Sequence, residues 1–162
     1  MLFRSPVHFE TQSAHRLELL GRHRQPSDQL LHLRAGSLLM RLGRDEFVLR
    51  QGDLFWLPAD CLHGLTLWQG CQFNRIRFSV RVLGERPRAA GYLHHHPLLM
   101  PLLERLEQQL AAAPLDWQGH SGRLSRLLAD LLPEFKISSH AAAPIDKGVQ
   151  CALATVRQGG DL

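Results

Sequence analysis

Histidine, cysteine and tryptophan gather in one short stretch of the chain, next to a glycine turn and a proline. The dipeptide Gly52-Asp53 is a turn signal between two apolar runs, Pro58 ends the second run, and His63 opens the next run. A neutral imidazole both donates and accepts hydrogen bonds, and it is also a common metal ligand. His63 is therefore a candidate for ligand or metal binding, and a satisfied histidine at the end of a strand is the alternative.

Two other patterns of cysteine and histidine do not indicate a metal site. Cys61 and His63 are two residues apart, but the chain has no C-x-x-C pair, and a structural zinc ion needs four ligands. The three consecutive histidines at 94–96 cannot all face one ion from a regular strand, so we expect an exposed loop there. No phosphate-binding glycine loop and no hydrolase motif is present, and we predict no catalytic residue.

The stretch around His63 resembles the second motif of cupin barrels, in which five residues separate a glycine from a proline and a histidine follows. Gly52, Pro58 and His63 take these places. Asp60 and Leu67 depart from the glycine and the asparagine that are usual in the motif.

Residues 21–36 resemble the first cupin motif, which carries two histidines and a glutamate. The resemblance implies that His23 matches one histidine and that Gln29 stands where the glutamate would be. Because an amide brings no charge, we expect at most weak binding of a divalent metal by His23 and His63, and no resident cofactor. We expect instead that His23, Gln29 and His63 bind a small organic molecule, since all three side chains both donate and accept hydrogen bonds.

Trp56 lies in the apolar run that Pro58 ends. One interpretation makes it a fourth ligand-binding residue, whose ring stacks on a bound molecule. The other makes it an aromatic side chain of the core.

Residues 1–92 have the pattern of a β-barrel, because short apolar runs alternate with glycine turns. Residues 75–82 alternate strictly, which predicts a strand with Ile76 and Phe78 on a buried face and arginines on a solvent-exposed face. The expected fold class is mainly β: a cupin-type barrel (double-stranded β-helix or jelly roll) followed by a two-helix hairpin. Other strands are expected within residues 29–34, 37–42, 46–49 and 54–57.

Residues 93–136 change to a helical period. Leucines recur at helical spacing in two segments, one stopped by Pro114 and the other by Pro133, which predicts a helical hairpin. Its apolar face must be buried, either on the barrel or on a second copy of the chain. The continuous stripe suggests a dimer interface, whose candidate residues are Leu99, Leu103, Leu106 and Leu110.

Residues 137–146 are small and polar and are typical of a linker. Residues 147–162 carry apolar side chains at helical spacing, but one short helix cannot bury its own stripe. A degenerate cupin, a helical hairpin, a linker and the start of a helix resemble regulators of the AraC type. The resemblance implies an effector-binding barrel, a dimerising hairpin and, at 147–162, the first helix of a truncated DNA-binding domain. DNA would then be contacted only through the missing domain.

Composition sets the remaining limits. The 162 residues are 44% hydrophobic and 21% charged, which is enough apolar surface for one folded domain. No run approaches the roughly 18 apolar residues of a membrane span, and the start lacks an apolar secretory segment. We expect a cytoplasmic protein without membrane contact. The net charge of +4 permits contact with nucleic acid, but the arginines form no basic block.

These observations favour an effector-sensing and dimerisation domain of an AraC-type transcriptional regulator, a homodimer and not an enzyme. Two alternatives stay open. One is a stand-alone metal-dependent cupin enzyme, such as a dioxygenase or an isomerase. The other is a barrel that serves only for dimerisation. The effector, and whether the regulator activates or represses, also stay open.

Overall fold

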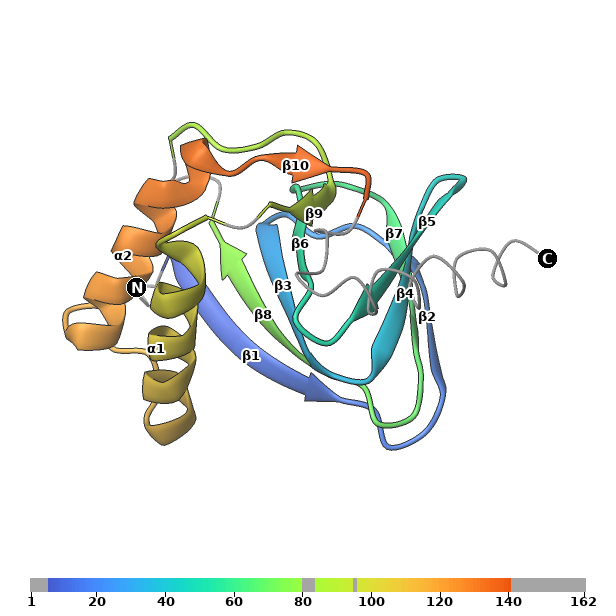
Figure 1. The fold of residues 1–162 in the computed structure, drawn as a ribbon, viewed down its shortest axis with the longest axis horizontal. Helices are drawn as coiled ribbons and strands as arrows, with labels where there is room; N and C mark the ends of the chain where they lie inside the picture. Colours follow the sequence, from blue (N-terminus) through green and yellow to red (C-terminus); the bar gives the residue numbers. More distant parts are fainter. Residues whose placement is uncertain (1–5, 80–83, 95, 141–162) are drawn as a thin grey trace.

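The computed structural model describes residues 6–79, 84–94 and 96–140, which form two antiparallel sheets and a helical layer (Figure 1). In spatial order, sheet A consists of β1 (Val7–Ser13), β8 (Gln72–Phe78), β3 (Asp28–Ala35), β6 (Leu54–Leu57), β9 (Gly91–Leu93) and β10 (Ile137–Ser138). Sheet B consists of β2 (Glu18–His23), β7 (His63–Leu67), β4 (Ser37–Leu42) and β5 (Asp45–Arg50).

The two sheets face each other in the jelly-roll arrangement that the sequence predicted. The chain crosses between the sheets at most of its turns, so strands far apart in sequence become neighbours, such as β1 beside β8 and β3 beside β6. Gly36 makes the crossing from β3 to β4 at φ +69°, and a Cβ there would lie 3.0 Å from the backbone of Cys71. The fold class, mainly β with two helices, is confirmed.

Sheet A is covered on both faces, and its strands therefore bury side chains of both parities. The inner face points toward sheet B, where Leu31, Phe55 and Phe73 pack with Met40 and Leu65. The outer face points toward the helices and carries residues of the opposite parity, namely Leu30, Trp56, Ile76 and Phe78. Burial on both faces explains why the first six residues of β3 are all buried, polar ones included, instead of every second residue.

The helical layer consists of α1 (Leu99–Ala112), α2 (His120–Leu131) and the short 3-10 helix η1 (Leu132–Glu134). Pro114 follows the end of α1 and Pro133 lies in η1, as the hairpin prediction requires. The leucine stripes of both helices pack on the outer face of sheet A, in one core with Trp56 and Phe78.

The predicted dimer interface is wrong for three of its four leucines. Leu99, Leu103 and Leu106 have no exposed surface, because the sheet of the same chain already covers them. Leu110 is partly buried against the same core. The alternative reading of the stripe, a hairpin that packs on its own barrel, is the one that the structure adopts.

Two further expectations need correction. Ile137–Ser138, the start of the predicted linker, form β10 and pair with β9. The arginines of β8 do not lie on a solvent-exposed face: Arg75 is buried and Arg77 is partly buried.

Residues 141–146 of the linker and the predicted helix at 147–162 lie outside the described residues. Within the described part of the chain, no helix is long and apolar enough to cross a membrane.

Candidate functional site

The polar residues singled out in the cupin motifs lie on the inner face of the barrel. His23 of β2 pairs with His63 of β7, and their ring centroids are 4.4 Å apart. Gln29 of β3 shares the parity of Leu31 and Leu33 and faces inward, with 1% of its surface exposed. All three side chains therefore belong to the space between the sheets, although their role in ligand binding stays a prediction.

Trp56 lies on the other face of sheet A, and the ligand-stacking interpretation of this residue is wrong. Its ring packs against Phe78 and Phe135 in the core beneath the helices and has no exposed surface. Its Nε1–H donates a hydrogen bond to the carbonyl of Pro87 at 2.8 Å. Strand alternation causes this placement, because Phe55 and Leu57 occupy the inward positions of β6.

Two arginines of β8 join the inward polar residues. Arg75 lies opposite Leu31 and Arg77 lies opposite Gln29, so both share the inner face. Their Nη1 and Nη2 atoms lie 3.0 and 2.9 Å from one carboxylate oxygen of Glu10, on the adjacent strand β1. We call Glu10, His23, Gln29, His63, Arg75 and Arg77 the inner cluster.

The sequence analysis missed the role of these arginines because it assigned them to solvent. Neither face of β8 is free, because sheet B covers one face and the helices cover the other. The alternation within one strand contains no signal for this coverage.

The inner cluster contains hydrogen-bonding atoms without partners. The Oε1 atom of Gln29 and the Nε atoms of Arg75 and Arg77 are buried and have no hydrogen-bond partner among the described residues. An unsatisfied buried polar atom costs about 1–3 kcal/mol, and most native buried polar atoms are paired. Three such atoms on one inner face point to a group that completes their hydrogen bonds.

His63 is held in its neutral form by its surroundings. Burial lowers the pKa of its imidazole, and the nearby His23 and Arg75 lower it further, against a smaller opposing effect of the Cys61 carbonyl. That carbonyl lies 3.0 Å from Nδ1 and can only accept, so Nδ1 carries the proton and Nε2 is left as an acceptor. His23 has the same arrangement with the carbonyl of Gly21, also at 3.0 Å.

Metal ligands are sparse at this site. In the part of the chain that the structure describes, no group of three or more His, Cys, Asp or Glu side chains could hold a metal ion. Arg75 is close enough to His63 to lower its pKa, and a guanidinium repels a divalent cation. The inner cluster therefore fits a metal ion poorly.

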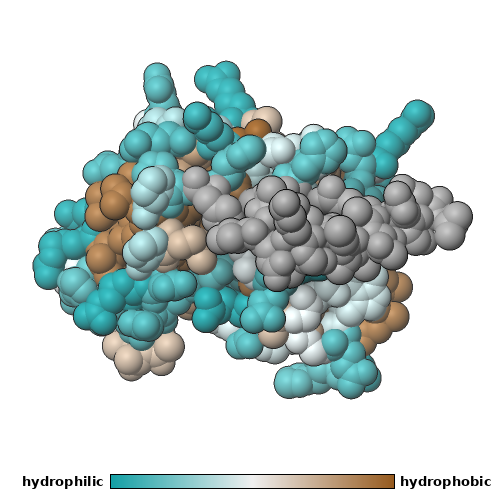
Figure 2. All heavy atoms as spheres, in the orientation of Figure 1, coloured by the Kyte–Doolittle hydropathy of each residue, from teal (hydrophilic) through white to brown (hydrophobic). Residues whose placement is uncertain are grey.

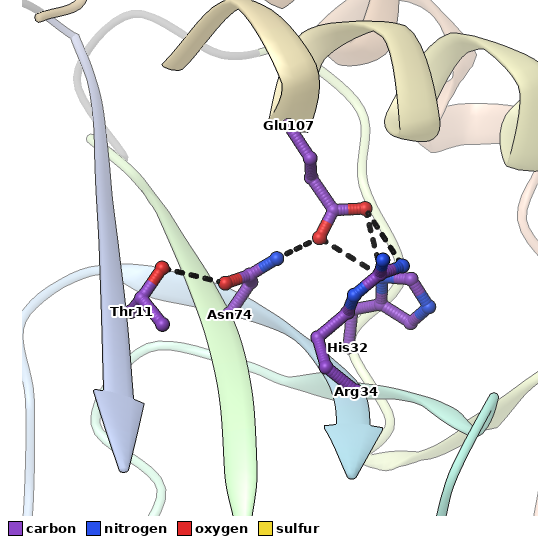
Figure 3. A network of polar contacts seen from close by, with 5 residues as sticks. All are labelled: Thr11, His32, Arg34, Asn74 and Glu107. Atoms are coloured by element: carbon purple, nitrogen blue, oxygen red, sulfur yellow. Dashed lines mark hydrogen bonds and ion pairs between the residues drawn. The ribbon is translucent and has the colours of Figure 1, made fainter. Parts of the chain in front are cut away.

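A second buried polar cluster lies on the outer face of sheet A, beneath α1 (Figure 3). The Glu107 carboxylate accepts hydrogen bonds from His32 Nδ1, at 2.9 and 3.1 Å, and from the side-chain amide of Asn74. Thr11 donates to Asn74 Oδ1 at 2.7 Å, and Arg34 Nη1 lies 3.8 Å from Glu107. We call these five residues the outer cluster.

Sequence reasoning did not find the outer cluster. Its signals were a histidine inside the apolar strand 29–34 and a glutamate beside Leu106 on the apolar face of the first helix. A groove of about 420 Å³ opens at the outer cluster, four of whose residues line it together with Glu104 and Gln108. A separate cavity of about 620 Å³ lies between Asp28, Arg86 and Phe135.

Comparison with known proteins gives one family and several structures. The model of the AraC-like ligand binding domain family matches residues 6–143. A cupin superfamily protein from Desulfitobacterium hafniense is 15% identical, with 49% of this chain and 72% of that chain covered and a TM-score of 0.45.

Two further solved structures are similar at the same level. An RmlC-like cupin from Shewanella frigidimarina is 18% identical (49% and 72% covered, TM-score 0.44). A conserved protein of unknown function from Streptococcus pyogenes is 18% identical (55% and 72% covered, TM-score 0.44). No curated protein matches the chain.

Proposed function

The chain belongs to the family of AraC-like ligand-binding domains, and from that premise we propose that it is the effector-sensing domain of a cytoplasmic transcriptional regulator. The effector is a small molecule that binds at the inner cluster, between the two sheets. Effector binding would favour one of two arrangements of the regulator, and so change DNA binding by a separate domain.

The observation that carries this proposal is the set of unpartnered atoms on the inner face. Gln29 Oε1, Arg75 Nε and Arg77 Nε lie on adjacent strands and on one side of sheet A. A ligand that met them would recover hydrogen bonds that the protein alone does not make. Leu31 and Phe73, on the same face, surround these atoms with apolar side chains of the core.

The inner cluster also has a route to solvent. The Glu10 side chain is 46% exposed, Arg77 is 32% exposed and Arg75 is only 9% exposed. Exposure thus falls from Glu10, on the edge strand β1, to the two arginines of β8, and along β8 from Arg77 to Arg75. This gradient suits a site that a small molecule enters from the β1 edge.

Homodimer formation remains part of the proposal, through a surface other than the leucine core. Leu98 and Leu127 are 57% and 46% exposed on the helical layer, where Figure 2 shows hydrophobic side chains among polar ones. We propose that this outer surface of the hairpin contacts the second copy.

The proposal is tested by capture of a ligand with the full chain. The protein is equilibrated with a small-molecule extract and washed, and retained molecules are identified by mass spectrometry. We expect one molecule per chain, lost in Gln29→Leu, which removes the unpartnered oxygen, and retained in Glu104→Gln, a change on the exposed face of α1. No retained molecule, or equal retention by Gln29→Leu, would contradict the proposal.

A metal-dependent cupin enzyme is the alternative, and the His23–His63 pair is the observation that favours it. Two imidazoles with free Nε2 atoms could hold an ion weakly, against the charge of Arg75. Metal analysis of protein made without an affinity tag separates the two functions. A stoichiometric metal that disappears in His63→Ala would support the enzyme.

A further inference from the structure

We infer that the effector is a small organic acid, bound through its carboxylate to Arg75 and Arg77 and through a hydroxyl or amino hydrogen to Gln29. The inference rests on the proposed function and adds the chemical class of the ligand.

The charges of the inner cluster do not balance. Arg75 and Arg77 bring two positive charges, and Glu10 is their one carboxylate partner among the described residues. Gln29 is uncharged, and His63 donates from Nδ1 to the carbonyl of Cys61. One positive charge is left over beside a buried strand, where a charge without a counter-ion is costly. A monoanion at this place removes the excess.

The unpartnered donors are of the kind that binds a carboxylate. Glu10 contacts one Nη atom of each guanidinium, while both Nε–H groups lack an acceptor within the described ranges. A guanidinium binds a carboxylate well because its N–H groups form a fixed fork. Positions 75 and 77 are two residues apart on one face of a strand, which places their backbones about 7 Å apart. Their long side chains can therefore meet the two oxygens of one carboxylate.

The unpaired acceptor atoms of the inner cluster would be satisfied by a ligand that carries a hydrogen-bond donor. Gln29 Oε1 has no donor in the part of the chain that the structure describes, and with only 1% of the residue exposed, solvent does not supply one. His63 Nε2 is an acceptor too, because Nδ1 donates to the carbonyl of Cys61. A simple apolar acid would leave these atoms unpaired, whereas a hydroxy or amino acid supplies an O–H or N–H to them.

The single excess charge also separates a carboxylate from a phosphate ester. A monoester of phosphate carries nearly two negative charges at neutral pH. It would replace an excess of one positive charge by an excess of one negative charge in a partly buried place. A monocarboxylate balances the inner cluster without a remaining charge.

The test compares acids with their neutral amides on the full chain. The probes are 4-hydroxybenzoate, 4-hydroxyphenylacetate, 2-hydroxyisocaproate and leucine, each beside its carboxamide, with inorganic phosphate as a simple anion. Binding is measured by calorimetry and by the shift in the melting temperature. We expect at least one acid to bind about tenfold or more tightly than its amide, a difference of about 1.4 kcal/mol.

Variants then assign the binding to the two arginines. Arg75→Met and Arg77→Met should each weaken the acid about tenfold or more and leave the weak binding of the amide unchanged. Arg44→Met, in the turn between β4 and β5, is the matched control and should bind the acid like the parent chain. Circular dichroism is the check that each variant is folded. Two arginine variants are used so that the conclusion does not depend on a single variant.

Several outcomes would overturn the inference. They are amides that bind as well as acids, acids whose binding survives both arginine variants, phosphate that binds as well as the acids, and a panel in which no acid binds. The proposed function is judged separately by the extract experiment. A neutral molecule retained there would support the proposed function and overturn the anionic class.

Discussion

Sheet A carries a buried polar cluster on each face, and neighbouring residues of the same strands build both. Asn74 points outward to Glu107, and the next residue, Arg75, points inward to Glu10. On the outer face, the Glu107 carboxylate is held by His32, Asn74 and Arg34. On the inner face, two guanidinium Nε atoms and one amide oxygen have no partner among the described residues.

The difference shows how to separate a structural polar cluster from a binding site. A buried polar cluster whose hydrogen bonds are complete adds rigidity, and here it ties α1 to the sheet. A cluster with missing partners lowers stability in the free protein and gains hydrogen bonds when a ligand arrives. Burial alone does not distinguish the two, since Glu107 and Arg75 are buried to nearly the same degree.

The largest expected effect breaks the outer cluster. Glu107→Ala should lower the free energy of unfolding by about 3 kcal/mol, because His32 and Asn74 remain buried without their acceptor. Urea denaturation measures the change. Glu104→Ala is the matched control on the exposed face of α1 and should stay within about 0.5 kcal/mol of the parent chain. Equal effects of the two variants would mean that the outer cluster contributes nothing to stability.

A smaller effect comes from acid, through His63 on the inner face. The pKa of His63 is lowered from 6.5 in the folded chain, so below pH 6.5 the unfolded chain binds more protons than the folded one. The stability of the neutral form is complete above pH 6.5 and is lost as the pH falls toward the lowered pKa. Melting temperatures between about pH 7 and about pH 5 measure this loss.

Two histidine variants separate this effect from general acid unfolding. His63→Asn keeps a donor toward the Cys61 carbonyl but does not titrate, so its melting temperature should fall less in acid. His15→Asn, at an exposed position, should follow the parent chain. Identical pH profiles for all three proteins would rule out the contribution of His63.

The smallest effect is expected for Arg75→Met. Burial lowers the pKa of this guanidinium, which shows that its charge is disfavoured where it lies. Glu10 is half-exposed and keeps its ion pair with Arg77 in this variant, so we expect a change in the free energy of unfolding below about 1 kcal/mol. A loss as large as that of Glu107→Ala, measured in the same urea titration, would show that the inner cluster is structural as well.

Local patterns predicted the strands and helices well. The strands 37–42 and 54–57 have the predicted bounds, β7 starts at His63, and both helices end at their prolines. These features depend on turn glycines, prolines and short-range periodicity, all of which are visible in the sequence itself.

The environment of each side chain was harder to predict, because it depends on which element covers each face of the sheet. Trp56 and the leucines of α1 were open to two interpretations, and the choice between them required the position of the hairpin on sheet A. The sequence analysis assigned Arg75 to a solvent-exposed face. Alternation indicates that the two faces of a strand differ in polarity, but it does not show that the polar face is exposed to solvent. The contact between His32 and Glu107 joins residues 75 positions apart, which no local pattern contains.

Asn74 and Arg75 point to opposite faces of sheet A, and this arrangement limits how β8 can evolve. A one-residue insertion or deletion within the strand would turn the side chains beyond it to the opposite face. The guanidinium would then lie beneath the helix and the amide between the sheets, so the helical anchor and the proposed ligand contacts would be lost in a single event. Sequence change in this strand is therefore expected to proceed by substitution and not by change of length.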